Sequence, residues 1–198
     1  MKIKICGLSR IRDIQIVNKA KPDYIGFIFA ESRRKVTLAQ AEELKKSLSS
    51  DISTVGVFAN EPIEHLLPLI RSGVIDMVQL HGSETEEYIA ELKSLAGKPV
   101  IKAVPVINAG DTQQWADTCA DYLLFDNAGG GSGRHFNWDL IGRIKKPYFL
   151  AGGLNSANIE QAMQKTDPYA VDINSGVETD GAKDEKKIHS IISMIRRE

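Results

Sequence analysis

Eight short apolar runs alternate with segments of helical periodicity along this 198-residue chain. The runs span residues 2–6, 24–29, 54–58, 77–80, 100–104, 122–126, 148–151 and 170–173. Between several of them, apolar residues recur three or four positions apart, which is typical of amphipathic helices. Repeated βα units require parallel strands joined by right-handed crossovers, so two architectures remain: an open doubly wound sheet and a closed (β/α)8 barrel. Eight units favour the α/β barrel.

The length of the chain favours a barrel with little decoration. A (β/α)8 barrel usually takes about 250 residues and rarely fewer than about 200. The glycine-rich stretch at residues 127–133 directly follows the sixth run and is too short for an interdomain linker. We therefore expect residues 1–198 to form one compact TIM-barrel domain. The helices predicted near residues 112–118 and 137–144 are short and weakly periodic, so we expect them to be partly irregular.

Composition disfavours several classes of function. Lys and Arg number 25 against 26 Asp and Glu, without a long block of one sign, which disfavours a nucleic-acid or membrane-surface partner. Cys6 and Cys119 cannot form a disulfide framework, and no cluster of cysteines and histidines predicts a metal site. No apolar run is long enough for a membrane span, and no targeting pattern precedes the first strand. We therefore expect a cytoplasmic protein. We also expect a monomer, because no extended apolar surface stripe remains.

The first predicted strand ends in a thiol. Successive side chains of a strand face opposite ways, so Ile3 and Ile5 share one face while Lys4 and Cys6 share the other. A face that carries lysine and cysteine suggests that this side of the strand lines a polar cavity. The alternative is a structural cysteine, since free Cys often packs as a small buried hydrophobe.

Polar residues gather where the predicted strands end. The candidates are Cys6, Arg33, Arg34, His81, Asp126, Asp172 and Asn174. Taken singly, each could cap a turn or be a solvated charge. In a barrel, however, all of these strand ends meet at one rim, which is where barrel enzymes place their active sites.

Three glycine-bearing loops follow the sixth, seventh and eighth predicted strands. They contain the candidate phosphate-binding residues Gly130, Gly131, Gly152, Gly153, Asn174, Ser175 and Gly176. Glycine lets backbone N–H groups approach an anion closely, and the loops after strands seven and eight of barrels frequently bind phosphate. The alternative is that these glycines only make tight turns. Neither a dinucleotide fingerprint nor a nucleoside-triphosphate loop fits, so we expect a small phosphorylated substrate.

Cys6 and Asp126 form a candidate base and acid, because they end the first and sixth predicted strands at the same rim. A thiol with a pKa of about 8.5 would need a cationic neighbour to ionise at neutral pH, and Lys4 is the candidate. Asp126 would need the opposite shift, which burial can supply. The scheme uses no cofactor and no metal.

The sequence resembles the phosphoribosylanthranilate isomerases of tryptophan biosynthesis over its whole length. The motifs that carry this resemblance lie at residues 4–8, 26–29, 32–34, 55–58, 79–82, 124–126, 130–133, 136–138, 151–154, 172–178, 181 and 183–184. The first and last motifs are specific to this family, whereas the phosphate loops are shared by many sugar-phosphate barrels.

The resemblance implies an Amadori rearrangement of N-(5-phosphoribosyl)anthranilate. It implies that Asp126 protonates the ring oxygen, that Cys6 removes the proton from sugar C2, and that Arg34 holds the anthranilate carboxylate. Asp172 resembles a rim carboxylate that orients its neighbours, and His81 a positioning residue.

Three positions depart from the usual form of the family. Arg33 stands where proline is common, Lys35 where an aromatic residue is common, and Asn174 where serine is usual. The competing enzyme classes are other sugar-phosphate barrels, such as indoleglycerol-phosphate synthase, the tryptophan synthase α subunit and ribulose-phosphate epimerase. A barrel that binds a sugar phosphate without turning it over is the non-enzymatic alternative.

Overall fold

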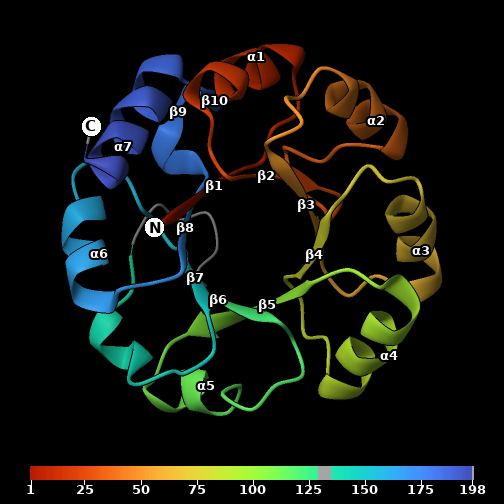
Figure 1. Ribbon diagram of the computed structural model, residues 1–198. Helices are drawn as coiled ribbons and strands as arrows, with labels where there is room; N and C mark the ends of the chain where they lie inside the picture. Colours follow the sequence, from red (N-terminus) through yellow and green to blue (C-terminus); the bar gives the residue numbers. More distant parts are fainter. Residues whose placement is uncertain (129–134, 198) are drawn as a thin grey trace.

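Eight parallel strands close into a barrel in the computed structural model, which describes residues 1–128 and 135–197 (Figure 1). The barrel strands are β1 (Lys2–Cys6), β2 (Tyr24–Ile28), β3 (Ser53–Phe58), β4 (Met77–Leu80), β5 (Val100–Val106), β6 (Tyr122–Asn127), β7 (Tyr148–Leu150) and β8 (Ala170–Ile173). Each strand pairs with the next along the chain, and β8 pairs with β1. The predicted (β/α)8 architecture is therefore confirmed, and the open-sheet alternative is excluded.

The helices form a ring around the strands (Figure 1). They are α1 (Ile11–Ala20), α2 (Leu38–Lys46), α3 (Ile63–Arg71), α4 (Glu86–Ala96), α5 (Gly110–Gln113), α6 (Ile159–Thr166) and α7 (Glu185–Arg196), with the 3-10 helices η1 (Trp138–Ile141) and η2 (Ser175–Val177). The elements α5 and η1 are short, and η1 is a 3-10 helix, so this part of the ring is partly irregular, as the sequence predicts. Among the described residues, no helix combines the length and the apolar content that crossing a bilayer requires.

Alternation along the strands separates an outer apolar core from the side chains inside the barrel. Ile3 and Ile5 belong to the outer core between the barrel and the helices. Cys6 belongs to a small inner cluster with Ile28 and Val57. The predicted assignment of the two faces of β1 is thus correct, and the polar face of this strand looks into the barrel.

Aromatic side chains fill the amino-terminal end of the barrel interior. Phe149 is fully buried, and the rings of Tyr24, Tyr122 and Tyr169 meet it edge-on, with centroids 5.6–5.7 Å away. The hydroxyl groups of Tyr24 and Tyr169 lie 2.7 Å apart. This aromatic floor keeps one end of the barrel packed, so the open end is the one where the strands terminate.

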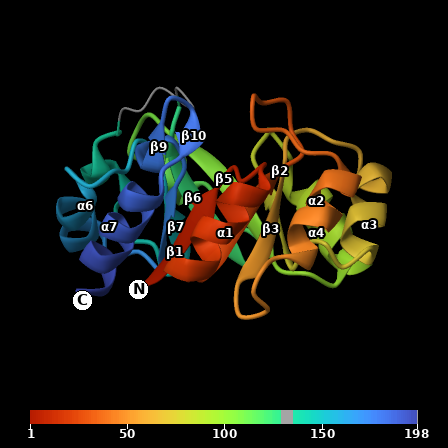
Figure 2. The same cartoon turned by 90° about the horizontal axis from the view of Figure 1, so that it is seen from above.

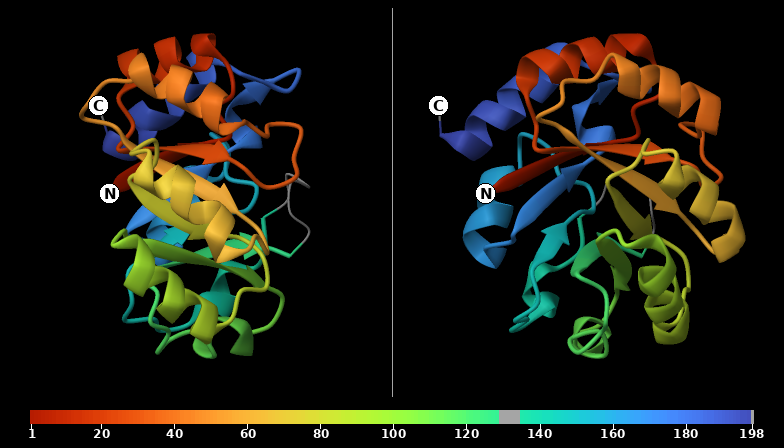
Figure 3. Two further views of the ribbon diagram at one scale, coloured as in Figure 1. Left: turned by 90° about the vertical axis from the view of Figure 1, so that its right-hand side faces the viewer. Right: turned by 45° about the vertical axis from the view of Figure 1, so that its right-hand side comes forward.

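A two-stranded hairpin that the sequence analysis did not predict follows β8. Its strands, β9 (Glu178–Thr179) and β10 (Ala182–Lys183), are antiparallel, and Lys183 pairs with Glu178. The turn between them uses Asp180 and Gly181, both with positive φ. Figures 2 and 3 show the hairpin beside β1 and α1, at the edge of the molecule away from the two termini.

Truncation of the aromatic floor should destabilise the whole barrel. Phe149→Ala removes a buried ring and leaves a cavity between three tyrosines, so we expect the free energy of unfolding to fall by about 3–5 kcal/mol in urea titrations. Ile107→Ala, at an exposed position, is the control and should change it by less than about 0.5 kcal/mol. Equal effects would show that the floor does not stabilise the barrel.

Candidate active site

A cavity of about 570 Å³ opens at the carboxyl ends of the strands. Eleven of the residues predicted from the sequence line it, namely Cys6, Arg33, Arg34, His81, Asp126, Gly152, Gly153, Asp172, Asn174, Ser175 and Gly176. Of the other predicted residues, Lys4 lies beneath the cavity, while Gly130 and Gly131 fall outside the described residues. The expectation that the strand ends form one rim is therefore correct for the described residues.

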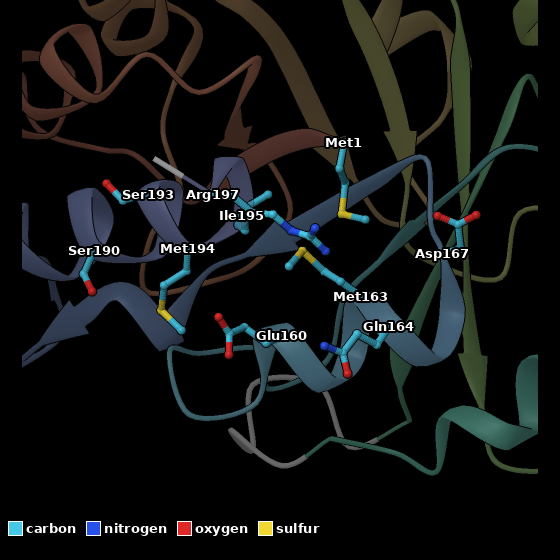
Figure 4. A pocket seen from close by; sticks show the side chains of 10 residues that line it. All are labelled: Met1, Glu160, Met163, Gln164, Asp167, Ser190, Ser193, Met194, Ile195 and Arg197. Atoms are coloured by element: carbon cyan, nitrogen blue, oxygen red, sulfur yellow. The ribbon is translucent and has the colours of Figure 1, made fainter.

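A larger hollow of about 830 Å³ lies elsewhere, between α6, α7 and the amino terminus (Figure 4). Met1, Met163 and Met194 place three thioethers around it. None of the predicted site residues that the structure describes lines this hollow. The chemistry-bearing residues therefore point to the smaller cavity.

Cys6 sits above a buried ion pair. Lys4 Nζ donates to Asp172 Oδ2 at 2.8 Å, and both side chains are almost completely buried. Gly26 makes room for the thiol, because a Cβ at that position would lie 2.6 Å from Cys6 Sγ. The thiol is only 5% exposed, yet it borders the cavity. A small group entering the cavity would therefore meet Cys6 in a site that is largely shielded from water.

Burial dominates the acidity of this thiol. It raises the pKa of Cys6 above the usual value, although Lys4 and Lys183 both act to lower it. Burial also acts to lower the pKa of Lys4, but Asp172 and Cys6 outweigh it and the net shift is upward. The cation that the sequence analysis required next to Cys6 is present. Lys4 stays charged, but its charge does not bring the pKa of the Cys6 thiol in the unliganded protein below the usual value.

His81 and Asp126 face each other across the same cavity. His81 Nε2 lies 3.5 Å from Asp126 Oδ2, and His81 Nδ1 lies 2.9 Å from Gln79 Nε2. Since the amide nitrogen of Gln79 is a donor, it directs the imidazole proton to Nε2, toward the carboxylate. The other Asp126 oxygen accepts from the backbone N–H of Asn127 at 2.7 Å. The Asp126 side chain is 21% exposed, so its burial is only partial.

Arg34 is fixed by a carboxylate from the hairpin. Its Nε and Nη2 donate to the two carboxylate oxygens of Glu178 at 2.7 and 2.6 Å. Lys183 Nζ donates to the same carboxylate at 2.8 Å, and also to the side chain and backbone of Asn174. Burial acts to raise the pKa of Glu178, but the bonds from Arg34 and Lys183 prevail and lower it to about 2.

The loops after β7 and β8 approach each other through their glycines. Gly152 and Gly153 have φ values of +86° and +65°, which L residues rarely adopt. A Cβ at Gly176 would lie 1.9 Å from the backbone oxygen of Leu154, so only glycine permits this contact. The two loops therefore form one continuous backbone surface beside the cavity, as a phosphate site requires.

Sequence reasoning assigned no role to Glu178, Lys183 or Gln79. Glu178 and Lys183 lie within two of the quoted motifs, but the partners of Glu178 are as far as 145 positions away in the chain. Gln79 lies on β4, two positions before His81, so the two side chains are expected to face the same way, which is a signal that could have indicated its role. Among the described residues, no group of three His, Cys, Asp or Glu side chains is suitably placed for a metal ion.

A family model for N-(5'-phosphoribosyl)anthranilate isomerase matches residues 3–194. The chain belongs to the phosphoribosylanthranilate isomerase family. The isomerase of Endomicrobium trichonymphae is 48% identical over 98% of each chain, and that of Clostridium acetobutylicum is 45% identical over 100% of this chain and 98% of its own. These similarities confirm the resemblance read from the motifs.

Solved isomerase structures superpose along the whole chain. The enzyme of Thermotoga maritima has a TM-score of 0.91 at 31% identity, with both chains fully covered. A second isomerase structure, with a TM-score of 0.89 and 31% identity over the full length of both chains, contains reduced 1-(o-carboxyphenylamino)-1-deoxyribulose 5-phosphate. A 3-hexulose-6-phosphate synthase shares the fold at 16% identity, with a TM-score of 0.70 over 96% of this chain and 99% of its own. The barrel alone therefore does not distinguish the phosphoribosylanthranilate isomerases from other enzymes.

Acid unfolding should show the contribution of the Glu178 carboxylate. Its pKa falls from 4.5 to about 2 on folding, so its stabilising effect is fully present above about pH 4.5 and is lost as the pH falls through about 2. We expect Glu178→Gln to abolish on the order of 3 kcal/mol of pH-dependent stability across this window, measured by urea unfolding at several pH values.

Glu185 provides the matched control, because it is ion-paired with Arg12 and Lys19 at the surface. Glu185→Gln should leave most of the pH dependence unchanged. Identical pH profiles for the unsubstituted protein and Glu178→Gln would contradict the assigned pKa.

Proposed function

We propose that this protein converts N-(5'-phosphoribosyl)anthranilate to 1-(2-carboxyphenylamino)-1-deoxyribulose 5-phosphate by general acid and base catalysis, as a step of tryptophan biosynthesis. The observation that carries this proposal is the presence of Cys6 and Asp126 in one cavity, with Arg34 and the glycine loops around it. Family membership supports the reaction, and the residues of the cavity supply a mechanism.

The first step opens the sugar ring. Asp126 donates a proton to the ring oxygen while the anthranilate nitrogen forms a double bond to C1, and the bond between C1 and the ring oxygen breaks. His81 and the backbone N–H of Asn127 lie beside the carboxyl group and stabilise the carboxylate that forms. The products of this step are a protonated imine and a free sugar hydroxyl.

The second step moves a proton from carbon. The Cys6 thiolate removes the proton from C2, and the electron pair shifts toward the imine nitrogen to give an enaminol, which tautomerises to the aminoketose. The ammonium of Lys4 favours the thiolate. The positive charge of the imine adds a second favourable field that the unliganded protein lacks, which offsets the effect of burial on the pKa of Cys6.

Polar groups around the cavity match the rest of the substrate. Asp172 Oδ1 and Gln79 Oε1 are buried without a hydrogen-bond partner among the described residues, so they can accept from sugar hydroxyls. In this proposal Arg34 binds the anthranilate carboxylate. The loops that contain Gly153, Ser175 and their neighbours hold the phosphate through backbone N–H groups.

Replacement of the proposed base or acid should abolish turnover while the fold and the substrate site persist. We expect Cys6→Ala and Asp126→Asn each to lower kcat by about 10²–10⁴-fold in a fluorescence assay with freshly made phosphoribosylanthranilate. Binding of the reduced product analogue, measured by calorimetry, should change little.

Cys119→Ala and Asp139→Asn are the matched controls, because both side chains are exposed and distant from the cavity. They should retain full activity. A barrel that only binds a sugar phosphate predicts no turnover by the unsubstituted protein. A related enzyme with other catalytic groups predicts no effect of Cys6→Ala and Asp126→Asn, and either result would refute the mechanism.

A further inference from the structure

Glu178 and Lys183 are buried charges that do not line the cavity, yet they contact residues that do. Their side chains are 5% and 1% exposed, and they form an ion pair across the β9–β10 hairpin. Arg34 and Asn174, which border the cavity, are their partners. Stability alone does not explain this buried ion pair beside the cavity, because replacing such pairs by apolar residues is often neutral or stabilising.

Glu178 occupies one edge of the Arg34 guanidinium. The side edge, formed by Nε and Nη2, is bonded to the carboxylate in a bidentate manner. Within residues 1–128 and 135–197, Nη1 makes no hydrogen bond to the protein. The end edge, formed by Nη1 and the second hydrogen of Nη2, therefore remains free for another planar anion. Because Arg34 is only 14% exposed and borders the cavity, that anion must come from the cavity.

Packing restricts Arg34 to this orientation. A Cβ at Gly7 would lie 2.5 Å from Arg34 Cδ and 2.9 Å from Asn174 Oδ1, so both side chains lie directly on the backbone that follows Cys6. Lys183 holds Asn174 and Glu178 together from the other side. The guanidinium is therefore clamped between the end of β1 and the hairpin.

The side chains of Arg33, Arg34, Glu178 and Lys183 form a cluster with an excess of positive charge. Arg33, Arg34 and Lys183 each donate to the Glu178 carboxylate, so one negative charge faces three positive charges. A carboxylate bound to the free edge of Arg34 would reduce this excess. The cluster thus favours a carboxylate-bearing ligand, but only if the guanidinium keeps its orientation.

We propose that Glu178, supported by Lys183, is the positioning residue that turns the free edge of Arg34 toward the substrate carboxylate and so makes the site selective for the anthranilate group. This inference rests on the proposed function, because it takes the ligand of Arg34 from that reaction. The hairpin is then a specificity element that acts through Arg34 without touching the substrate.

Two ligands separate this role from a structural one. The first is the reduced product analogue, which carries the carboxylate, and the second is the same compound with an unsubstituted phenyl ring. In Glu178→Gln, the amide nitrogen replaces an acceptor by a donor that faces Arg34 or Lys183. We expect calorimetry to show affinity for the carboxylated ligand falling by roughly tenfold to a hundredfold. Affinity for the phenyl ligand should change less than about twofold.

Two further variants sharpen the test. Glu185→Gln, the same substitution in a surface ion pair, should leave both affinities unchanged. In an Arg34→Ala background, Glu178→Gln should cause no additional loss, since the two residues act in one pathway. If Glu178→Gln does not fold, Glu178→Asp keeps the charge but withdraws it from Arg34, and the same selective loss is expected.

Equal weakening of both ligands in a folded Glu178 variant would overturn the proposal, because Glu178 would then only support the barrel rim. An additional loss in the Arg34→Ala background would also overturn it. If the unsubstituted protein bound neither ligand, the proposed function itself would fail. If it bound both ligands equally, Arg34 would have no role in carboxylate binding, and the inference about Glu178 would fall while the reaction remained untouched.

Discussion

The ion pair between Lys4 and Asp172 is the contact on which the site depends, because it joins the strands that close the barrel. The two residues are register partners on β1 and β8, so the pair forms where the beginning and the end of the chain meet. It also places a cation directly beneath Cys6. A barrel that failed to close at this seam would lose the environment of its thiol together with its shape.

The rim of the barrel contains buried ion pairs, which stability alone does not favour. Buried ion pairs gain little over apolar packing. In the pair between Glu178 and Lys183, both side chains make further hydrogen bonds: Lys183 also donates to Asn174, and Glu178 also accepts from Arg33 and Arg34. Asp172 keeps one buried oxygen without a partner among the described residues. These features are concentrated on the cavity, while the opposite end of the barrel is filled by aromatic rings. The aromatic end of the barrel stabilises the fold, and the charged end contains the residues proposed to bind and convert the substrate.

The sequence predicts most of the barrel because alternation along strands is a local signal. The bounds predicted for β1, β4 and β8 agree with the structure, and the two faces of β1 follow from parity. Strands of two residues carry no such periodicity, so the β9–β10 hairpin was not predicted.

The candidate site is predictable from the sequence as far as it depends on where the strands end. A strand end can be located from the sequence, so Cys6 and Asp126 were found, and the rim that collects them follows from the barrel. The balance between burial and charge at Cys6 depends on neighbours such as Gly26 and Lys183, which are brought together only by folding. For the same reason the bidentate bond between Arg34 and Glu178 was not foreseen.

The separate roles proposed for the Cys6 thiol and the Asp126 carboxyl group can be tested with substrate deuterated at C2. Serine is a much weaker base than a thiolate at neutral pH, so in Cys6→Ser the removal of the C2 proton should become rate-limiting. We expect a large primary isotope effect on kcat for Cys6→Ser. For Asp126→Asn, where ring opening is slowed instead, we expect an effect close to unity. The reverse pattern, or no isotope effect in either variant, would contradict the assignment of Cys6 as the base.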